Sequence, residues 1–456
     1  MLSFLKPAPA IPPLPDERVD DEYRRQRRNV FIGIFAGYAA FYLVRQNLAL
    51  AIPDILKDFP QHTKAGLGMG ITALSIAYGL SKFIMGSVSD RSNPRRFLPL
   101  GLLLSAGIIA VCGLVKSVYA WLPLVVGLMA LNGWVNGMGW PPCGKTMVHW
   151  FGARERGRVV SFWNVAHNVG GGLAGGLAGV GFVLFSGDWG AKFYFNAMVA
   201  ACVAGLAYFL MRDTPQSCGL PPIERYKNDY PPGYSAADER VFSFREIFLE
   251  HVLPNKALWA IALANAFVYF VRYGVVSWIP AYLQTSKGFS FTESSIAWQV
   301  FEYAAIPGTI LCGWMSDKIF KSRRAPATIL FMTLTLAGVI LYWLNIRGPV
   351  WIDYVALLTV GFFIYGPIML IGLQALELVP KKAAGTAAGF TGFFGYVFGA
   401  AASGVGVGWI ADRWHWQGVF VAMVACCVLT MVFSALTLRR RPSGGAETEK
   451  PSVSQN

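Results

Sequence analysis

The sequence predicts an all-α polytopic membrane protein whose twelve transmembrane helices form two halves of six. The chain of 456 residues is 55% hydrophobic and only 14% charged, whereas about 25% of the residues of a soluble protein are charged. Many apolar runs reach the ~20 residues with which a helix crosses a bilayer. In addition, motifs of the first half recur in the second half at a spacing of 227 positions.

Twelve apolar runs are long enough to be membrane spans. Their length and continuity indicate helices, and their amphipathic period is weak, as expected for helices that are buried on all sides. We expect the spans at residues 29–52, 65–89, 97–116, 121–144, 158–185, 192–211, 257–284, 293–315, 327–345, 352–376, 384–411 and 416–438.

The segments outside these spans define the domain organisation. Residues 1–28 are rich in proline and then in arginine, and we expect them to form a cytoplasmic N-terminal segment. Residues 213–256 hold several prolines, near-balanced charge and no run long enough to span, so we interpret them as a cytoplasmic linker. This linker joins the half at 29–212 to the half at 257–438, and residues 439–456 form a cytoplasmic tail.

Loops on one side of the predicted membrane are strongly basic, while those on the other side carry few charges of mixed sign. Cytoplasmic loops are enriched in lysine and arginine, so we expect the basic loops and both termini in the cytoplasm. The same bias accounts for the net charge of +14 without nucleic acid as a partner. The basic loop residues are Arg91, Arg95, Arg96, Arg154, Arg156, Arg158, Lys318, Lys321, Arg323, Arg324, Lys381, Lys382 and Arg439 to Arg441.

Metal and catalytic patterns do not stand out in the sequence. The seven cysteines lie mostly within apolar runs and form no Cys-x-x-Cys pair, which predicts neither a metal site nor a disulfide. No nucleophile–base pair is recognisable either, so we expect no enzymatic activity and no cofactor.

Two motifs establish the internal repeat. Tyr42-Leu-Val-Arg45 returns as Tyr269-Phe-Val-Arg272, and Gly86-Ser-Val-Ser-Asp-Arg91 returns as Gly313-Trp-Met-Ser-Asp-Lys318, both after 227 positions. Parallel repeats of this kind build transporters whose substrate site lies near the membrane midplane between the halves.

Arg45 and Arg272 are the first candidates for substrate binding. An arginine at the centre of a bilayer costs at least ~2.5 kcal/mol, and intramembrane charges usually mark function. A guanidinium fork matches phosphate bidentately and stays charged when desolvated, so two of them favour a phosphate dianion. A dicarboxylate remains an alternative, as does a structural salt bridge with Glu302, the one acid deep in a span.

Further polar side chains within the spans could complete this site. Lys82, on one helix face with Tyr78, adds a third cation, unless it extends to the cytoplasmic side near Asp90. His167 forms a polar patch with Asn164 and Asn168. Histidine and tyrosine in spans are often only packing residues, although their polar atoms could also bind phosphate or its organic group. The candidate tyrosines are Tyr38, Tyr42, Tyr269, Tyr365 and Tyr396.

Glycines four residues apart occur in the fifth and eleventh predicted spans, at Gly171, Gly175 and Gly179 and between Gly385 and Gly399. Small residues at this spacing let helices approach closely. We therefore expect both stripes at the interface between the halves.

Several segments resemble the organophosphate:phosphate antiporters of the major facilitator superfamily, and the similarity fails only in the C-terminal tail. The similar segments are Gly37–Arg45, Ser81–Pro94, Gly139–Cys143, Trp163–Asn168, Arg212–Pro222 and Pro380–Gly389. The resemblance implies a major facilitator fold and a monomer in the bacterial inner membrane. It also implies exchange of external glycerol-3-phosphate for internal inorganic phosphate by alternating access, and entry of phosphonates such as fosfomycin.

The resemblance implies roles for individual residues as well. Arg45 and Arg272 would bind phosphate, assisted by His167 and Lys82. Where the family has a lysine after the first arginine, this sequence has Gln46, which removes one positive charge.

Cytoplasmic gating contacts are implied at the repeated glycine-aspartate loops. Asp90 and Asp317 lie at helix ends near loop cations and would form these contacts, with helix capping and surface pairing as the alternative. We group Arg91, Lys318 and Glu302 with these gating residues.

Three alternative functions stay open. A hexose-phosphate or phosphoglycerate antiporter would share both arginines, so they do not discriminate among phosphate esters. A membrane sensor of phosphate esters would keep the site but perform no exchange. A proton-coupled symporter would need a titrating carboxylate, for which Glu302 is the deep candidate.

Overall fold

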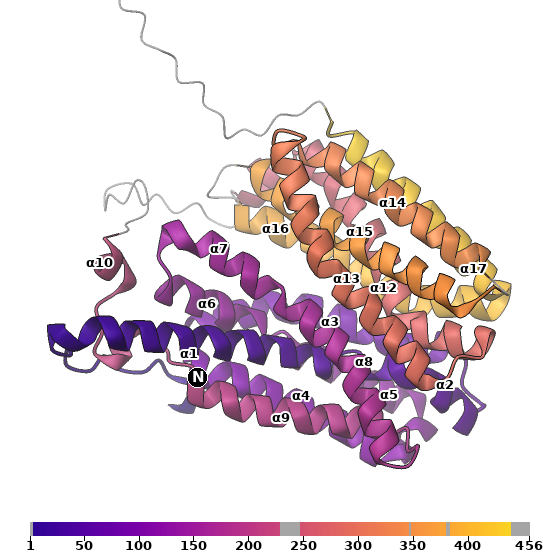
Figure 1. Cartoon of the computed structure of the whole chain (residues 1–456), viewed down its shortest axis with the longest axis horizontal. Coiled ribbons are helices and arrows are strands. Elements are labelled where there is room, and N and C mark those ends of the chain that lie inside the picture. The colour runs from indigo at the N-terminus through magenta and orange to yellow at the C-terminus, as the bar shows by residue number, and fades with distance from the viewer. Residues whose placement is uncertain (1–2, 229–246, 346–347, 380–383, 439–456) are drawn as a thin grey trace, which may run out of the picture.

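The computed structural model describes residues 3–228, 247–345, 348–379 and 384–438, and all regular structure in these ranges is helical. The first half, shown indigo to magenta in Figure 1, lies beside the second half, shown orange to yellow. The helices of the first half are α1 (Asp16–Leu43), α2 (Asn47–Asp58), α3 (Lys64–Asp90), α4 (Pro94–Leu114), α5 (Leu122–Asn136), α6 (Trp140–Trp150), α7 (Ala153–Asn164), α8 (Ala166–Leu184) and α9 (Ala191–Leu210).

The second half contains longer uninterrupted helices. Its elements are α12 (Lys256–Lys287), α13 (Phe291–Lys318), α14 (Arg324–Leu344), α15 (Val350–Glu377), α16 (Ala384–Phe393), the π-helix η6 (Phe394–Ala400) and α17 (Ala401–Ala435). Short elements outside the two bundles are η1 (Ser3–Leu5), η2 (Lys116–Ala120), η3 (Pro215–Cys218), α10 (Ile223–Lys227) and the π-helix η4 (Ile247–Val252).

Three predicted spans of the first half are each divided into two helices. The span 29–52 breaks between α1 and α2, 121–144 breaks between α5 and α6, and 158–185 breaks between α7 and α8. In the second half, α17 bends at Trp414 and His415, whose φ of 56° is left-handed. This bend separates the eleventh predicted span from the twelfth.

The predicted all-α membrane fold is confirmed, whereas the count of twelve crossings stays a prediction. Seven helical segments in the described part of the chain are long and apolar enough to cross a membrane. The last of them, 386–435, covers two predicted spans because α17 continues through its bend. The other predicted ranges are helical too, and those at 29–52 and 158–185 are divided by breaks into shorter helices.

The two halves diverge at one end of the molecule and meet at the other. Figure 1 shows the gap widening toward the end where α1 begins, and the halves converging near α2. At the converging end, α3 packs against α17 and α2 against α12. A Cβ on Gly68 would lie 2.4 Å from the Gly404 carbonyl oxygen, so the backbones of α3 and α17 are nearly in contact.

Polar contacts reinforce this closed seam between α3 and α17. The Lys64 ammonium lies 3.6 Å from the Asp412 carboxylate, which also accepts a hydrogen bond from the Ala65 amide at 2.8 Å. The Thr72 hydroxyl accepts from the Val405 amide at 3.0 Å. The halves are therefore held together at the end of α3 that lies far from the basic loop after Asp90.

A second seam joins α8 to α13 and contains the glycine stripe of the fifth predicted span. Trp298 Nε1 donates to the Gly171 carbonyl oxygen at 2.8 Å, and Gly175 faces the same indole. The expectation for this stripe is met. In the eleventh predicted span the expectation is wrong for Gly395 and Gly399, which contact Asn265, Ala266 and Tyr269 of their own half.

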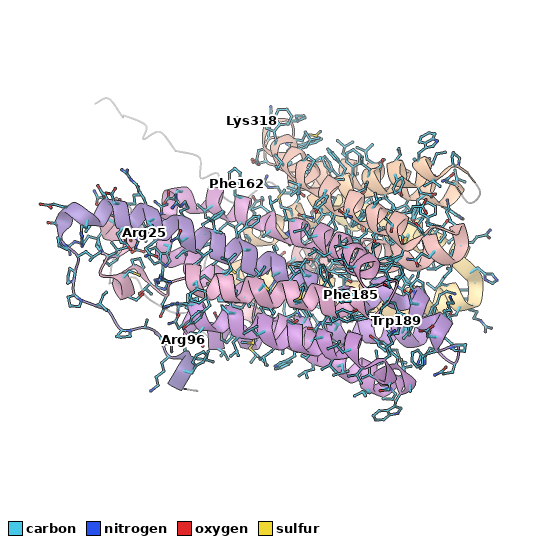
Figure 2. The ribbon with its side chains drawn as sticks, turned by 60° about the horizontal axis from the view of Figure 1, so that its bottom comes forward. Arg25, Arg96, Phe162, Phe185, Trp189 and Lys318 are labelled. Atoms are coloured by element: carbon cyan, nitrogen blue, oxygen red, sulfur yellow. The ribbon has the colours of Figure 1, made fainter. Side chains whose placement is uncertain are left out.

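The N-terminal segment folds back onto the end of the first half that carries the basic loops. Leu5 is buried with Phe97, Val135 and Met138, and its carbonyl oxygen accepts from the Asn93 amide at 2.9 Å. Figure 2 shows Arg25 and Arg96 at one end of the molecule and Phe185 and Trp189 at the other. This separation agrees with the predicted alternation of basic loops and loops with few charges of mixed sign, while the domain boundaries themselves stay predictions.

Candidate functional site

Arg45 lies in the break between α1 and α2, where Val44 and Gln46 have non-helical backbone angles. Its side chain is only 4% exposed. Nε donates to Asn136 Oδ1 at 3.1 Å, whereas Nη1 and Nη2 have no hydrogen-bond partner among the described residues. Two donors of a buried cation are thus available to a ligand.

Arg272 occupies the equivalent position of the repeat, but it lies within the unbroken helix α12. Its side chain is 6% exposed, and its Nε has no hydrogen-bond partner in the described ranges. The guanidinium carbon lies 4.3 Å from the ring centre of Tyr365 and 4.9 Å from that of Tyr273. Cation–π contacts of this kind stabilise a buried guanidinium without neutralising it.

Aromatic rings connect the two arginines across the interface. The Arg45 guanidinium carbon lies 4.5 Å from the Tyr42 ring. Tyr42 lies 5.8 Å from the His167 ring, and His167 lies 5.8 Å from Tyr365, which contacts Arg272. His167 is therefore the central member of this row, with one arginine beyond each neighbouring tyrosine.

A second aromatic row connects the same arginines along another path. Arg45 lies 4.2 Å from the Tyr78 ring, and Tyr78 lies 5.0 Å from Tyr396. Tyr396 lies 6.2 Å from Tyr273, which contacts Arg272. The two rows together surround the arginine pair with aromatic side chains from both halves.

The remaining predicted site residues lie around these rows. His167 Nδ1 hydrogen-bonds the Asn164 carbonyl oxygen, while the Asn164 side chain is exposed, so Asn164 contributes through its backbone. Tyr38 packs on Trp163 at 4.5 Å and on Tyr42 at 5.7 Å. Tyr269 lies 5.2 Å from Tyr396.

A cavity of about 580 Å³ lies between the halves on the side of the basic loops. Lys82 is one of its lining residues, and its ammonium lies 5.4 Å from the Trp140 ring and 6.0 Å from the Tyr396 ring. The alternative, in which Lys82 extends toward Asp90, stays open, because the Asp90 side chain lies outside those that the structure describes. Tyr396 borders this cavity and also belongs to the second aromatic row, so its side chain lies between the cavity and the arginine pair.

Glu302 lies near Arg272 but does not form an ion pair with it in the described part of the chain. The carboxylate is 4% exposed and accepts from the Tyr365 hydroxyl at 2.7 Å and from Asn168 Nδ2 at 3.3 Å. A Cβ on Gly171 would lie 2.8 Å from Glu302 Cδ. Neutral donors from both halves thus hold this acid at the seam between α8 and α13.

The comparisons with known proteins agree with this two-half architecture. The sequence model of the Major Facilitator Superfamily matches residues 34–404, which is most of the chain. The chain belongs to the major facilitator superfamily.

Two curated relatives place it further within that superfamily. A glycerol-3-phosphate transporter of Bacillus subtilis (strain 168) is 52% identical over 437 residues, which cover 96% of this chain and 98% of the relative. A probable hexose phosphate transport protein of Chlamydia muridarum is 38% identical over 91% of this chain and 92% of its own. The chain thus belongs to the branch of the major facilitator superfamily that contains these organophosphate transport proteins.

Solved structures share the major facilitator fold. A bacterial homologue of the human lysosomal transporter Spinster, in an inward-facing and unoccupied conformation, aligns with a TM-score of 0.69. It covers 91% of this chain and 96% of its own at 17% identity, so this likeness concerns the fold alone.

The glycine-aspartate loop of the second half contains a network of ion pairs. Asp317 forms an ion pair with Arg324 at 2.5 Å, and Arg324 also donates to Glu377 at 2.7 and 3.1 Å. Lys318 is exposed.

The equivalent loop of the first half is described less completely. The side chain of Asp90 lies outside those that the structure describes, and Arg91 is exposed. The gating roles of Asp90, Arg91, Asp317 and Lys318 stay predictions, as does that of Glu302.

Sequence reasoning missed Tyr273 and Asn136, which touch an arginine directly. It named Tyr78 only as sharing a helix face with Lys82, and Asn168 only as part of the polar patch at His167, whereas Tyr78 contacts Arg45 and Asn168 binds Glu302. Tyr273 follows Arg272 immediately, so adjacency could have suggested it. Asn136 has no such signal, because nothing in the sequence shows that α5 packs behind the break at Arg45.

Proposed function

We propose that this protein exchanges external glycerol-3-phosphate for internal inorganic phosphate and holds the phosphate group between Arg45 and Arg272. The observation that supports this most strongly is the pair of buried guanidiniums from equivalent repeat positions, with N–H groups that no described residue uses. Arginine forks bind phosphate oxygens bidentately and remain charged when desolvated. The 52% identity to a glycerol-3-phosphate transporter supports the choice of organic group.

The charge of the site favours a dianion. Neutral hydrogen-bond donors hold Glu302, and the described residues provide no carboxylate within ion-pair distance of Arg45 or Arg272. Lys82 adds positive charge at the wall of the cavity. His167, the other predicted ligand, lies between the two arginines through Tyr42 and Tyr365, and its ring nitrogen not bonded to Asn164 would face the phosphate oxygens.

The placement of the cavity and the closed seam supports alternating access. In the state described, the cavity lies on the basic-loop side with Tyr396 between it and the arginine pair, and α3 and α17 close the opposite end. A bound dianion neutralises the repulsion between the arginines and draws the halves together on the cavity side. Because only the loaded carrier would then reorient readily, uptake of one anion requires release of another.

Several properties accompany this mechanism. The outward gradient of phosphate would drive uptake without a cofactor, and the protein would act as a monomer in a bacterial inner membrane with both termini in the cytoplasm. The halves at 29–212 and 257–438 would move about the linker at 213–256. A phosphonate such as fosfomycin carries a similar anionic head group and would use the same route.

Hexose phosphate transport is the second candidate function. The 38% identity to a probable hexose phosphate transport protein favours it, and a cavity of about 580 Å³ has room for a hexose. The arginine pair would bind either phosphate ester, so the substrate must be distinguished by competition.

Proteoliposome exchange tests the proposal. Vesicles loaded with phosphate should accumulate labelled glycerol-3-phosphate, and empty vesicles should not, with glucose-6-phosphate a weak competitor. Strong competition by glucose-6-phosphate would favour the hexose phosphate function instead. Binding without exchange would contradict transport and indicate a sensor of phosphate esters.

A further inference from the structure

We infer that Ser105, Asn132 and Asn136 orient the Arg45 guanidinium and thereby set the affinity of the site for phosphate. We call these three residues the asparagine relay. The inference rests on the proposed function, because it assigns positioning residues to the phosphate site at Arg45. The relay residues come from α4 and α5, and the three side chains are essentially unexposed.

The relay begins at the arginine itself. Asn136 Oδ1 accepts the Nε hydrogen of Arg45 at 3.1 Å. The Asn136 amide nitrogen donates to Ser105 Oγ at 3.0 Å, to Asn132 Oδ1 at 3.0 Å and to the Asn132 carbonyl oxygen at 2.9 Å. These donations fix which end of the Asn136 amide faces Arg45, so an oxygen and not an NH2 group meets the guanidinium.

The relay also holds the backbone beside Arg45. Asn132 Nδ2 donates to the Val44 carbonyl oxygen at 2.8 Å, and Ser105 Oγ donates to Asn132 Oδ1 at 2.5 Å. Val44 directly follows the last residue of α1 and caps its C-terminus, at the break that contains Arg45. A carbonyl at a helix end needs a partner outside the helix, and Asn132 supplies it. One network therefore secures both the backbone turn and the side chain of the arginine.

Buried polar networks are rigid when every member is satisfied. Among the described residues, the side-chain atoms of Ser105, Asn132 and Asn136 all have hydrogen-bond partners, whereas Nη1 and Nη2 of Arg45 have none. Asn136 thus accepts the hydrogen bond of Nε, while Nη1 and Nη2 remain without a partner among the described residues. A phosphate would meet a fork whose direction is already set, which lowers the cost of ordering it on binding.

The described residues of the second half show no equivalent network. A Cβ on Gly133 would meet the Leu74 carbonyl oxygen as one on Gly361 would meet that of Phe301, so α5 and α15 correspond at a spacing of 228 positions. The counterparts of Asn132 and Asn136 are therefore Val360 and Ile364, which have no polar side-chain atoms, and that of Ser105 at the spacing of 227 is Met332. Arg272 Nε accordingly has no partner in the described ranges. Arg45 is the fixed arginine of the pair, and Arg272 depends on its aromatic neighbours.

Phosphate binding to the purified protein, together with exchange by proteoliposomes, tests this inference. Asn136→Leu keeps a similar volume but removes the acceptor of Nε, so the half-saturating concentration of phosphate should rise about tenfold or more. Ser105→Ala should give a smaller rise. The exchange rate at saturating phosphate should change much less than the affinity. Ile364→Leu, at the counterpart of Asn136 in the second half, serves as the control and should leave both quantities unchanged.

A merely structural role would lower thermal stability in Asn136→Leu without changing the half-saturating phosphate concentration, and that result would overturn the inference. If Asn136→Leu does not fold, an unchanged affinity in Ser105→Ala would overturn it equally. Failure of the proposed function is a separate result. In that case the native protein would not bind phosphate, or Arg45→Lys would bind it as tightly as the native protein does. An affinity loss confined to the relay and Arg45 variants supports the inference.

Discussion

The Tyr365 hydroxyl donates to the Glu302 carboxylate at 2.7 Å. The ring of the same tyrosine lies 4.3 Å from the Arg272 guanidinium carbon. Tyr365 therefore stands between the deepest acid and one of the two arginines, and it contacts each with a different part of its side chain. This arrangement keeps the arginine unneutralised while the acid remains hydrogen-bonded.

Removing the Tyr365 hydroxyl should uncouple these two contacts. In Tyr365→Phe the ring remains over Arg272, but Glu302 loses its shortest hydrogen bond. Leaving a buried charged group short of a partner costs about 1–3 kcal/mol, so the melting temperature of the purified protein should fall. Tyr342→Phe is the matched control, because the Tyr342 hydroxyl is buried without a hydrogen-bond partner among the described residues. A similar loss in both variants would argue against a specific role of the Tyr365 hydroxyl.

Glu302→Gln tests exchange against proton-coupled symport. The glutamine oxygen can still accept from Tyr365 and Asn168, so the seam between α8 and α13 should persist. In an antiporter that uses the arginine pair, exchange of phosphate should remain within about threefold of the native rate, a difference of less than ~1 kcal/mol in the barrier. If uptake by the native protein depends on an imposed pH gradient and Glu302→Gln abolishes this uptake, Glu302 would instead be identified as the proton carrier.

The close approach of α3 and α17 predicts a defect in reorientation rather than in binding. Even a Cβ atom at Gly68 would lie 2.4 Å from the Gly404 carbonyl oxygen. A leucine there would collide with this carbonyl group and would prevent closure of that end. Gly68→Leu should therefore reduce exchange at least about tenfold, which corresponds to ~1.4 kcal/mol or more in the barrier. Phosphate binding in detergent should persist. Gly107→Leu is the control, because a Cβ there meets nothing within 4 Å.

The sequence was most informative where the repeat imposed a relation between distant residues. Arg45 and Arg272 were found because the same short motif recurs, and the structure brings both to one aromatic enclosure. Tyr42, Tyr365, Tyr396 and His167 also lie there, as predicted from their place in the spans. Their roles in binding stay predictions.

Contacts that depend on packing between helices could not be predicted in the same way. Asn136 meets Arg45 because α5 lies behind a break in the first span, and no glycine or proline marks that break in Val44-Arg45-Gln46. Arg324 forms the ion pair with Asp317, and the sequence did not show which of the nearby loop cations would do so. In a span buried on all sides, hydrophobic periodicity is too weak to show which face meets which neighbour.

The glycine stripes show the same limit. Gly171 and Gly175 reach the other half, but Gly395 and Gly399 receive side chains of α12 from their own half. Spacing by four indicates that a helix can be approached closely. It does not show which helix approaches it, because that depends on how the two bundles are arranged.

The measurement that tests the central claim most directly is phosphate binding to the purified native protein, Arg45→Lys and Arg272→Lys. Lysine keeps the positive charge but lacks the planar fork. If both arginines hold one phosphate, each variant should lose at least about tenfold in affinity, and labelled phosphate exchange should fall in parallel; this corresponds to ~1.4 kcal/mol or more. Native affinity in either variant would contradict a phosphate held between Arg45 and Arg272.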